Sequence, residues 1–433
     1  MARKRRRTEE VRRTNRAGLA ALSLLLTKQL APAEGDDAAT AAAGGANANL
    51  AFSPASIYAA LALLAAGARG GTLQELVDAL GGETRDDAAA FARRVAEGAL
   101  ADRSRSGGPA VAFACGAWHD AAWALRPGFR DAAAASYNAE ARAVGFSNEA
   151  LNEINGGVAA ATNNRIDSIL DSSSVNSHTS LVIASAVYFK GKWETPFAKS
   201  HTKVDKFHRL DGGAADVPFM CSSRSQLIAV RNGYKVLKLP YRSPAPPPPP
   251  PPPPPRKGKK SSQTKAGDEL SVSETAADEL PRYSLCLASG PGFWHYRLPA
   301  TPVPVGEFRL PKFKLSVSGS VRQALRDDMG INAAFVAGDA DLSHMAERGD
   351  GGDGGGTPLH VGDVCHKAVL EVNEEGSKAS MVATGSYMLC GANAVMDQPE
   401  TVDFVADHPF VFFVIEEVSR AIVLVGRVLD PSV

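Results

Sequence analysis

The chain has 433 residues, of which 44% are hydrophobic and 22% are charged, as expected for a globular protein with a large core. Lysine plus arginine and aspartate plus glutamate both number 47, so no overall charge attracts nucleic acid or an anionic membrane surface. The five cysteines are scattered without CxxC spacing and the nine histidines lack HExxH spacing, which argues against a disulfide framework or a metal site and favours a reducing compartment.

The N-terminal segment joins a basic run to an apolar stretch. The run RKRRR at 3–7 is followed by AGLAALSLLL at 17–26, and together they can imitate a secretory signal. Leucines recur at helical spacing in and after this stretch: Leu19, Leu22, Leu25, Leu26 and Leu30. This spacing favours an amphipathic helix over a signal peptide. Residues 1–16 then form a basic flexible tail, which is either a nuclear address or a plain solvated tail.

The region from 50 to 100 has a helical pattern. FSPASIYAALALLAAGA is rich in alanine and leucine, and GGTLQELVDALGG follows it. In the second segment Glu75 comes three residues after Thr72, which predicts a capping box at the start of that helix.

Strand-like runs begin near residue 108. AVAFACGAW is followed later by LVIASAVYFKGKW at 181–193, a run too continuously apolar for a surface strand and suited to a sheet covered on both faces. Between them, ALNEINGGVAAATNNRIDSIL predicts a helix, which Gly156 and Gly157 weaken by roughly 1 kcal/mol each. Further strands are expected at KVDKFHRL, QLIAVR and YKVLKLPY.

Two low-complexity segments interrupt this globular pattern. Residues 243–280 contain ten prolines at 246–255, then RKGKKSSQTK and an acidic, serine-rich stretch, which predicts a stiff polyproline II rod flanked by disordered charge. We interpret the segment as a tolerated loop insertion, and the alternative is a ligand for an SH3 or WW domain. The glycine-rich stretch at 349–356 predicts a second flexible loop, and without GK[ST] it does not indicate a nucleotide site.

The C-terminal part returns to ordered patterns. EFRLPKFKLSVS predicts strands, VRQALRDDMG a helix, and PFVFFVIEE with AIVLVGRV a buried hairpin. Before the hairpin, EVNEEGSKASMVATGSYMLC at 371–390 passes from an acidic strand end through one glycine into mostly small residues, with no apolar face to anchor them. The elements together indicate one domain made of helices, a large mixed sheet, a mobile loop and a closing hairpin.

Taken in order, these motifs resemble the serpin family, and plant serpins in particular, from about residue 17 to the C-terminus. The matching segments are NLAFSPASI, GARGGT, SAVYFKGKW, KLPY, EFRLPKFKLS, MGINAAF, CHKAVLEVNEEG, FVADHPFVFFV and VGRVLDP. The resemblance implies an α+β serpin fold over residues 17–433, with three β-sheets, about nine helices and an exposed reactive-centre loop at 376–396. It also implies a metastable native state.

The function that the resemblance implies is inhibition of serine-type endopeptidases, not catalysis. Cleavage of the reactive-centre loop would let the loop insert as an extra central strand of the main sheet and carry the acylated protease with it. The alternative is a non-inhibitory serpin that acts as a binding or structural protein. An enzyme is disfavoured because Cys365 beside His366, and Asp407 beside His408, do not assemble a nucleophile, a base and an orienting acid.

By the resemblance, Glu375 and Gly376 form the hinge of the loop. The residues that would insert are Ser377, Lys378, Ala379, Ser380, Met381, Val382 and Ala383. Because side chains alternate along a strand, the odd-numbered residues from Ser377 would face the core and the even-numbered ones solvent. Lys378 replaces a usual acid at a solvent-facing position, whereas Met381 replaces a usual alanine at a core position, where overpacking costs about 1 to 3 kcal/mol.

The resemblance also implies a polar cluster, the shutter, beneath the central strands. Ser53, Ser56 and His366 match this cluster, while Ser185 replaces its usual asparagine. Trp193 matches the tryptophan of the breach, the end of the sheet where insertion begins.

Two further departures from the family pattern concern the core. Gly157 replaces a tryptophan in a helix motif, a loss of volume that costs on the order of several kcal/mol if it is unfilled. After Cys286 the chain passes almost directly to PGFWHYRLP, where the family continues the strand and adds short helices, so this deletion is expected to disturb the second sheet.

The reactive bond is placed by counting. Fifteen residues from Gly376 lead to the bond Cys390–Gly391, whereas counting back from DHPF leads to a bond about three residues later. A cysteine here, where plant relatives often have arginine, predicts a target that accepts a small apolar residue. We expect a serine protease as partner, or alternatively a cysteine or metacaspase-like protease, and no cofactor, metal, nucleic acid or membrane. We expect a monomer in the cytoplasm, with the nucleus and the extracellular space as alternatives.

Overall fold

A computed structural model of the chain describes residues 18–27, 48–146, 148–171, 174–176, 179–231, 234–245, 280–288, 298–348, 358–376 and 401–433. The basic tail, most of the proline-rich insertion and the whole glycine-rich loop at 349–356 lie outside these ranges. So do the predicted inserting residues after Gly376 and the predicted reactive bond Cys390–Gly391.

The described residues form seven α-helices, where the resemblance implies about nine. They are the helix at 18–27, α2 (Pro54–Gly67), α3 (Gly70–Ala79), α4 (Arg85–Glu97), α5 (Pro127–Tyr137), α6 (Asn148–Ala161) and α8 (Arg322–Asp327). Short 3-10 turns lie at Ser104–Ser106, Lys199–His201 and Ala333–Phe335. The first helix confirms the amphipathic pattern, because Leu19, Leu22 and Leu26 are buried.

The central sheet has five strands in the order β12-β14-β5-β2-β4. Their bounds are β12 Phe313–Ser320, β14 Asp363–Val372, β5 Leu181–Lys190, β2 Ala110–Asp120 and β4 Ala139–Val144. The pairs β14–β5 and β2–β4 are parallel, and the other neighbours are antiparallel. All residues of β5 except its last are buried, which confirms a strand covered on both faces.

The other two large sheets are antiparallel apart from one short pair. The six-stranded sheet contains β1 Leu50–Phe52, β17 Ala421–Val428, β16 Phe410–Glu416, β10 Tyr283–Ala288, β9 Tyr234–Pro240 and β8 Leu227–Arg231, in that order. The four-stranded sheet contains β15 Phe404–Val405, β11 Phe308–Pro311, β7 Ala214–Cys221 and β6 Lys203–His208. A small pair joins β13 Ala346–Arg348 to β3 Trp123–Leu125.

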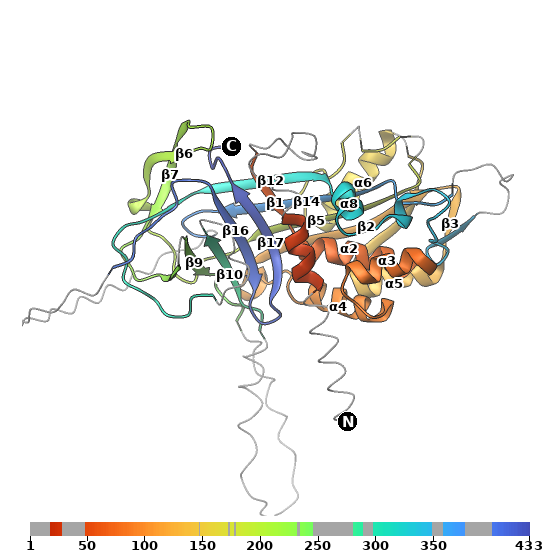
Figure 1. Ribbon diagram of the computed structural model, residues 1–433, viewed down its shortest axis with the longest axis horizontal. Helices are drawn as coiled ribbons and strands as arrows, with labels where there is room; N and C mark the ends of the chain where they lie inside the picture. Colours follow the sequence, from red (N-terminus) through yellow and green to blue (C-terminus); the bar gives the residue numbers. More distant parts are fainter. Residues whose placement is uncertain are drawn as a thin grey trace, which may run out of the picture.

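The main core lies between the central sheet and the six-stranded sheet. The nearly fully buried helix α2 contacts β2 and β5 of the first and β17 of the second (Figure 1). A second, smaller core on the other face of the central sheet lies beneath α6 and includes Trp118, Ile154 and Val158. Figure 1 also shows β6 and β7 at one end of the elongated molecule and α3, α5 and β3 at the other.

The residue Gly157, which replaces a tryptophan of the family pattern, lies beside side chains of two strands. A Cβ atom at Gly157 would meet Glu140 at 3.0 Å and the Trp118 ring at 3.9 Å, so the space beside this helix residue is already taken. Trp118 is 2% exposed, and its ring lies over Gly116, where a Cβ atom would clash at 2.4 Å. The Trp118 indole of β2 therefore packs beside this helix residue, which is itself only partly buried.

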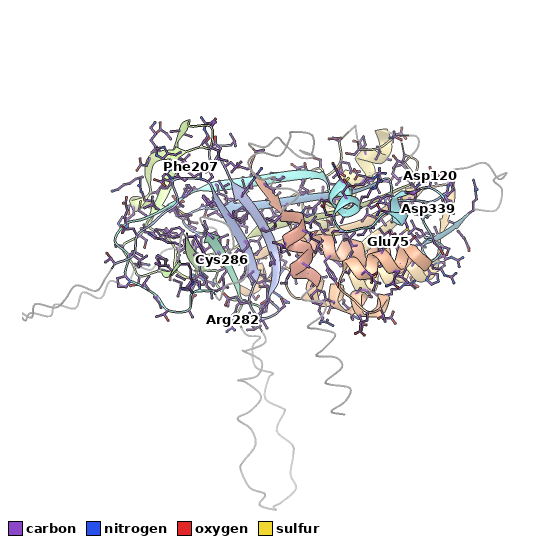
Figure 2. The ribbon with its side chains drawn as sticks, viewed as in Figure 1. Glu75, Asp120, Phe207, Arg282, Cys286 and Asp339 are labelled. Carbon is purple, nitrogen blue, oxygen red and sulfur yellow. The ribbon has the colours of Figure 1, made fainter. Side chains whose placement is uncertain are left out.

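The predicted capping box of Thr72 and Glu75 is wrong. The helix α3 begins two residues before Thr72 and has no side-chain cap. The Thr72 hydroxyl accepts a hydrogen bond from the Asp341 N–H (3.0 Å), and Glu75 accepts two from the backbone at 332–333 (2.8 Å each). Both side chains therefore hold the segment that contains Asp339, which is labelled with Glu75 in Figure 2.

The expected disturbance of the second sheet at Cys286 is also wrong. Strand β10 is fully buried and pairs with β16 on one edge and with β9 on the other. Cys286 lies opposite Phe413 and Lys238 in this ladder and can be found in Figure 2. The departure from the family pattern therefore begins only after the strand has been completed.

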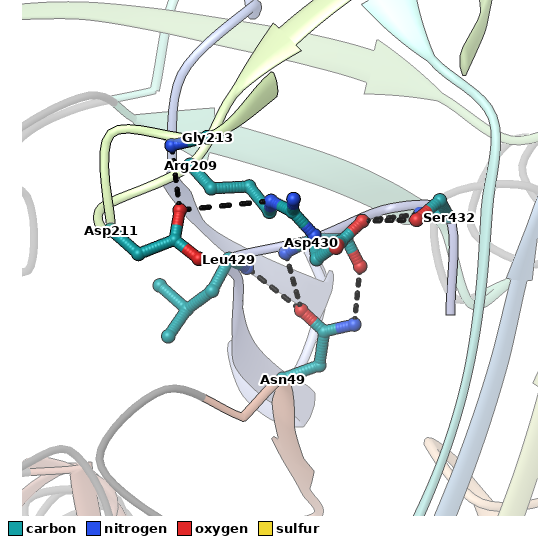
Figure 3. A network of polar contacts seen from close by, with 7 residues as sticks. All are labelled: Asn49, Arg209, Asp211, Gly213, Leu429, Asp430 and Ser432. Carbon is teal, nitrogen blue, oxygen red and sulfur yellow. Dashed lines mark hydrogen bonds and ion pairs between the residues drawn. The ribbon is translucent and has the colours of Figure 1, made fainter. Parts of the chain in front are cut away.

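Residues near the C-terminus connect the six-stranded sheet to the four-stranded sheet. The Asn49 side chain, just before β1, accepts the N–H groups of Leu429 (2.7 Å) and Asp430 (3.0 Å) and donates to the Asp430 carbonyl (2.6 Å), as Figure 3 shows. Arg209, in the turn between β6 and β7, forms an ion pair with Asp430 at 2.9 Å. The C-terminal residues thus connect the six-stranded sheet to the four-stranded sheet.

Candidate functional site

Gly376 is the first residue of the predicted loop and the only one of its residues 376–396 that the structure describes, and its position admits only glycine. Its φ of 65° lies in the left-handed region. A Cβ atom there would come within 2.2 Å of the Gly191 carbonyl oxygen and 2.6 Å of the Trp193 nitrogen. Conformation and packing both require the absence of a side chain in this state, while the hinge role itself stays a prediction.

Gly376 lies at one end of the boundary between β14 and β5, which we call the seam. Eight residue pairs close the seam, from Asp363 opposite Val182 to Leu370 opposite Phe189. The two strands are parallel and directly bonded, and parallel pairing is slightly weaker per residue than antiparallel pairing. A segment that turned back along β14 from Gly376 would run antiparallel to both strands of the seam.

On the inner face of the seam, His366 of β14 links both strands to α2. Its Nε2 accepts a hydrogen bond from the Ser53 backbone N–H (2.9 Å), and its Nδ1 lies 3.0 Å from Ser185 Oγ on β5. Because Nε2 accepts, the ring is neutral and carries its proton on Nδ1, which donates to Ser185. Burial lowers the pKa of His366 to about 3, so this arrangement persists at physiological pH.

The same inner cluster contains one unsatisfied hydroxyl. Ser53 caps α2, with its Oγ accepting the Ser56 N–H at 3.1 Å. The Ser56 hydroxyl is fully buried and has no hydrogen-bond partner among the described residues. Ser185, which replaces a longer asparagine of the family pattern, contacts His366 in this cluster. The structure thus brings together all four predicted shutter residues but leaves their network incomplete.

Trp193 closes the end of the seam next to Gly376. Its indole N–H donates to the Asn373 carbonyl (2.7 Å), and its backbone N–H donates to the Glu375 carbonyl (3.3 Å). The ring is 1% exposed and stacks on Tyr241, with centroids 4.4 Å apart. A rigid aromatic pair therefore holds the turn after β14 against the segment after β5.

On the outer face, Lys190 of β5 and Glu371 of β14 form an ion pair across the seam, with Nζ and Oε2 2.8 Å apart. The other carboxylate oxygen of Glu371 accepts a hydrogen bond from Asn373 Nδ2 (2.9 Å). The Oδ1 atom of Asn373 in turn accepts the Glu375 N–H (3.2 Å). These contacts form a continuous polar chain from the seam to the turn that carries Gly376.

Two further carboxylates fix that turn. Glu374 is almost buried and accepts hydrogen bonds from Thr202 Oγ1 (2.8 Å) and Lys312 Nζ (3.2 Å). Burial by itself would raise the pKa of Glu374, but its hydrogen bonds to the backbone, Thr202 and Lys312 outweigh burial and lower that pKa. Glu375 pairs with Lys199 at 2.5 Å. The turn is thus anchored to the residue between β11 and β12 and to the segment after β5.

Sequence reasoning missed most of these polar partners. It singled out Glu375 but not Lys190, Lys312, Glu371 or Asn373. The acidic run EVNEEG at 371–376 was the one available signal. Its partners Lys190 and Lys312 are 181 and 62 positions away from Glu371 and Glu374, so no local pattern indicates these pairs. The predicted inserting residues and reactive bond lie outside the described residues, so they stay predictions.

The site offers neither a catalytic dyad nor a metal centre. Cys365 belongs to the core cluster on one face of β14, whereas His366 binds Ser53 on the other, and burial raises the pKa of the Cys365 thiol well above its ordinary value. No group of three histidine, cysteine or acidic side chains in the described ranges is arranged to hold a metal ion. No helix in the same ranges is both long and apolar enough to cross a membrane.

Known proteins share this architecture. The family described as serpin (serine protease inhibitor) matches residues 38–245 and 294–431. Serpin-Z2A of Oryza sativa subsp. japonica is 43% identical over 432 residues, covering 96% of this chain and 97% of that protein. Serpin-Z7 of Hordeum vulgare is 36% identical over 398 residues, covering 89% and 90%. The structure of Arabidopsis AtSerpin1 in its native stressed conformation is similar with a TM-score of 0.76 and 28% identity, covering 98% of this chain and 99% of that one.

Proposed function

The chain belongs to the serpin family of serine protease inhibitors, and we propose that it traps its target protease by suicide-substrate loop insertion. A protease nucleophile attacks the carbonyl carbon of the reactive residue, the peptide bond to the next residue breaks, and the new amine leaves with its proton. The acyl-enzyme bond then tethers the protease to the freed loop. Insertion of that loop into the seam carries the protease across the sheet before water can release it.

The observation that carries this proposal is the closed seam beside the glycine at its end. Five strands already form the central sheet, and the pair β14–β5 is parallel. A strand entering from Gly376 replaces one parallel ladder by two antiparallel ladders. Seven inserting residues make about fourteen backbone hydrogen bonds while the parallel ladder gives up about eight, so a net gain of about six bonds at roughly 1 kcal/mol each supplies a driving force on the order of 6 kcal/mol.

The inserting strand in this proposal is 377–383, with Glu375 and Gly376 as its hinge. Small residues at the core-facing positions favour entry, because the inner face of the seam is already packed against α2. Met381 is the one large core-facing residue, and its flexible thioether side chain can adapt to an irregular gap.

The reactive bond is proposed at Cys390–Gly391, with a bond about three residues later as the alternative. The target is a serine protease that accepts a small apolar residue before the cut, and a cysteine or metacaspase-like protease is the alternative. Mass spectrometry of the fragment released by a panel of proteases locates the bond.

A denaturing gel tests the inhibitory function. Intact chain incubated with an excess of each protease is expected to form an SDS-stable adduct with at least one of them. A clipped chain without any adduct, together with no rise in melting temperature after cleavage, would contradict insertion. That outcome favours the alternative of a non-inhibitory serpin that acts as a binding or structural protein.

A matched pair of variants tests the direction of the inserting side chains. Ala379→Arg places a charge on the core-facing side and is expected to convert the inhibitor into a cleaved substrate. Ser380→Arg places the same charge on the outward side and should leave adduct formation largely intact. Equal behaviour of the two variants, measured as the ratio of adduct to clipped chain, would contradict the proposed alternation.

We propose a single domain over 17–433 that carries a tolerated proline-rich insertion at 243–280 and acts as a monomer in the cytoplasm. The nucleus and the extracellular space are the alternatives, which imaging of a fluorescent fusion with and without residues 1–16 distinguishes. The alternative role of the proline run is to bind an SH3 or WW domain, which a pull-down with such a domain tests.

A further inference from the structure

The ion pair of Lys190 and Glu371 joins the two strands of the seam directly. The side chains are 23% and 28% exposed, so the pair is partly shielded from solvent. Glu371 lies opposite Lys314 of β12 in the sheet register, which leaves the carboxylate between two lysine-bearing strands. The pair lies on the outer face, whereas the contacts of His366 lie on the inner face.

This pair cannot survive loop insertion. Neighbouring strands are about 4.8 Å apart, so a strand between β5 and β14 would roughly double their separation. The 2.8 Å contact of Lys190 with Glu371 is therefore a property of the closed sheet alone. Whatever free energy it contributes stabilises the closed state and must be given up as the seam opens.

The location of the pair decides when it breaks. Lys190 precedes Gly191, whose carbonyl oxygen would lie 2.2 Å from a Cβ atom at Gly376. The pair thus lies at the end of the seam where the hinge is packed. Strands that separate from this end lose the pair at the start of insertion.

Asn373 connects the pair to the hinge turn. Its amide nitrogen donates to Glu371, its amide oxygen accepts the Glu375 N–H, and its carbonyl accepts the Trp193 indole N–H. A movement of the turn that displaces Asn373 removes one of the two contacts that orient the Glu371 carboxylate. Hinge movement and parting of the ion pair are therefore coupled through one side chain.

We propose that Lys190 and Glu371 form a latch that sets the rate at which the seam opens, and that Asn373 couples this latch to the hinge. The proposal deepens the proposed inhibitory function and rests on it for its biological role. The three residues are positioning residues, since none of them would touch the protease nucleophile.

The test measures opening of the seam without any protease. A synthetic peptide with the sequence of residues 377–388, SKASMVATGSYM, is added to the intact full-length chain, and its uptake is followed by tryptophan fluorescence and native gels. Lys190→Met and Glu371→Gln are each expected to speed uptake roughly threefold to tenfold, because a partly buried ion pair of the closed state is removed. The double variant should be no faster than the faster single one. Unchanged rates, or single effects that multiply in the double variant, would overturn the latch.

A matched control and a rescue separate the latch from a general structural effect. Lys206→Met removes the ion pair of Lys206 with Asp216 (2.8 Å), which lies in the four-stranded sheet, and should leave uptake within about 1.5-fold of the wild-type rate. The conservative variant Lys190→Arg keeps a positive charge beside Glu371 and should restore the slow uptake of the wild type. Failure of this rescue, or an equal effect of the control, would count against the proposal.

The variant Asn373→Ala tests the coupling between the ion pair and the hinge turn. Asn373→Ala keeps the two charges but removes the amide link, and it is expected to speed uptake in the wild-type background and not in Lys190→Met. Uptake by the wild type should also quicken between about 0.05 and 0.5 M salt, whereas Lys190→Met should respond little. An identical salt response of the two chains would contradict a charge-based latch.

The latch and the inhibitory function fail in distinguishable ways. Peptide uptake that depends on Lys190 and Glu371, without a protease adduct, retains the latch and refutes inhibition. Adducts with a protease, but equal uptake by all variants, retain inhibition and refute the latch. If neither wild type nor variants take up peptide, hydrogen exchange of the β5 amides decides: faster exchange in Lys190→Met supports the latch, and equal exchange overturns it.

Discussion

Acidification should weaken the native state through His366. Its neutral ring accepts the Ser53 N–H at 2.9 Å, and a proton on Nε2 would abolish that bond inside a buried cluster. Burial lowers the pKa of His366 to about 3, against an ordinary value of 6.5 in the unfolded chain. The unfolded state therefore binds more protons between these two values, so stability falls as the pH falls from about 6.5 toward 3.

The size of the effect follows from the same two values. At pH 5 the unfolded imidazole is almost fully protonated, and the gap of about 1.5 pH units corresponds to roughly 2 kcal/mol of lost stability. Most of this loss appears between pH 7 and pH 5. Urea denaturation of the intact chain at both pH values measures the difference.

A variant that cannot titrate isolates this contribution. Gln at position 366 offers an amide oxygen for Ser53 and an amide N–H for Ser185, so His366→Gln keeps both hydrogen bonds. Between pH 7 and pH 5, the free energy of unfolding of His366→Gln is expected to fall by about 2 kcal/mol less than that of the wild type. The control variant His201→Gln, changed at an exposed site, should behave like the wild type. His119, whose pKa is also lowered by burial, contributes equally to all three chains. An unchanged pH dependence in His366→Gln would refute the reasoning.

Three substitutions test the packing of the site and its surroundings. Ser185→Asn is expected to give the Ser56 hydroxyl a partner and raise the free energy of unfolding by about 1 kcal/mol in urea, and no gain would mean that the amide does not reach it. Gly376→Ala forces a Cβ atom into the facing backbone at positive φ and should cost about 1 to 3 kcal/mol, seen as a lower melting temperature; an unchanged value would contradict the described turn. Gly157→Trp should destabilise by about 1 to 3 kcal/mol because Glu140 and Trp118 already lie beside this position, and the same change should cost less in Trp118→Ala; strictly additive effects would argue against shared volume.

Features that depend on neighbouring residues could be predicted from the sequence. The leucine spacing identified the helix at 18–27, and the continuous apolar run at 181–190 identified a strand covered on both faces. A single glycine between an acidic strand end and small residues marked position 376, where the backbone is left-handed. Helical and strand periods and glycine conformations act over a few residues, so they are visible without the fold.

Features that depend on residues far apart were decided by the tertiary structure. The Glu75 side chain has the right spacing for a cap but binds the backbone near residue 332, because that segment passes the helix end. The indole of Trp118 lies beside Gly157 although it comes from a different element. Local spacing carries no information on either contact.

The polar contacts of the seam show the same limit most clearly. Lys190 and Glu371 are 181 positions apart, and only the parallel register of β5 with β14 brings their side chains together on the outer face. The order of apolar and small residues along the chain determines which strands form and which way they face. The register of two paired strands decides which charged side chains become neighbours. This register is set only when the whole sheet has formed.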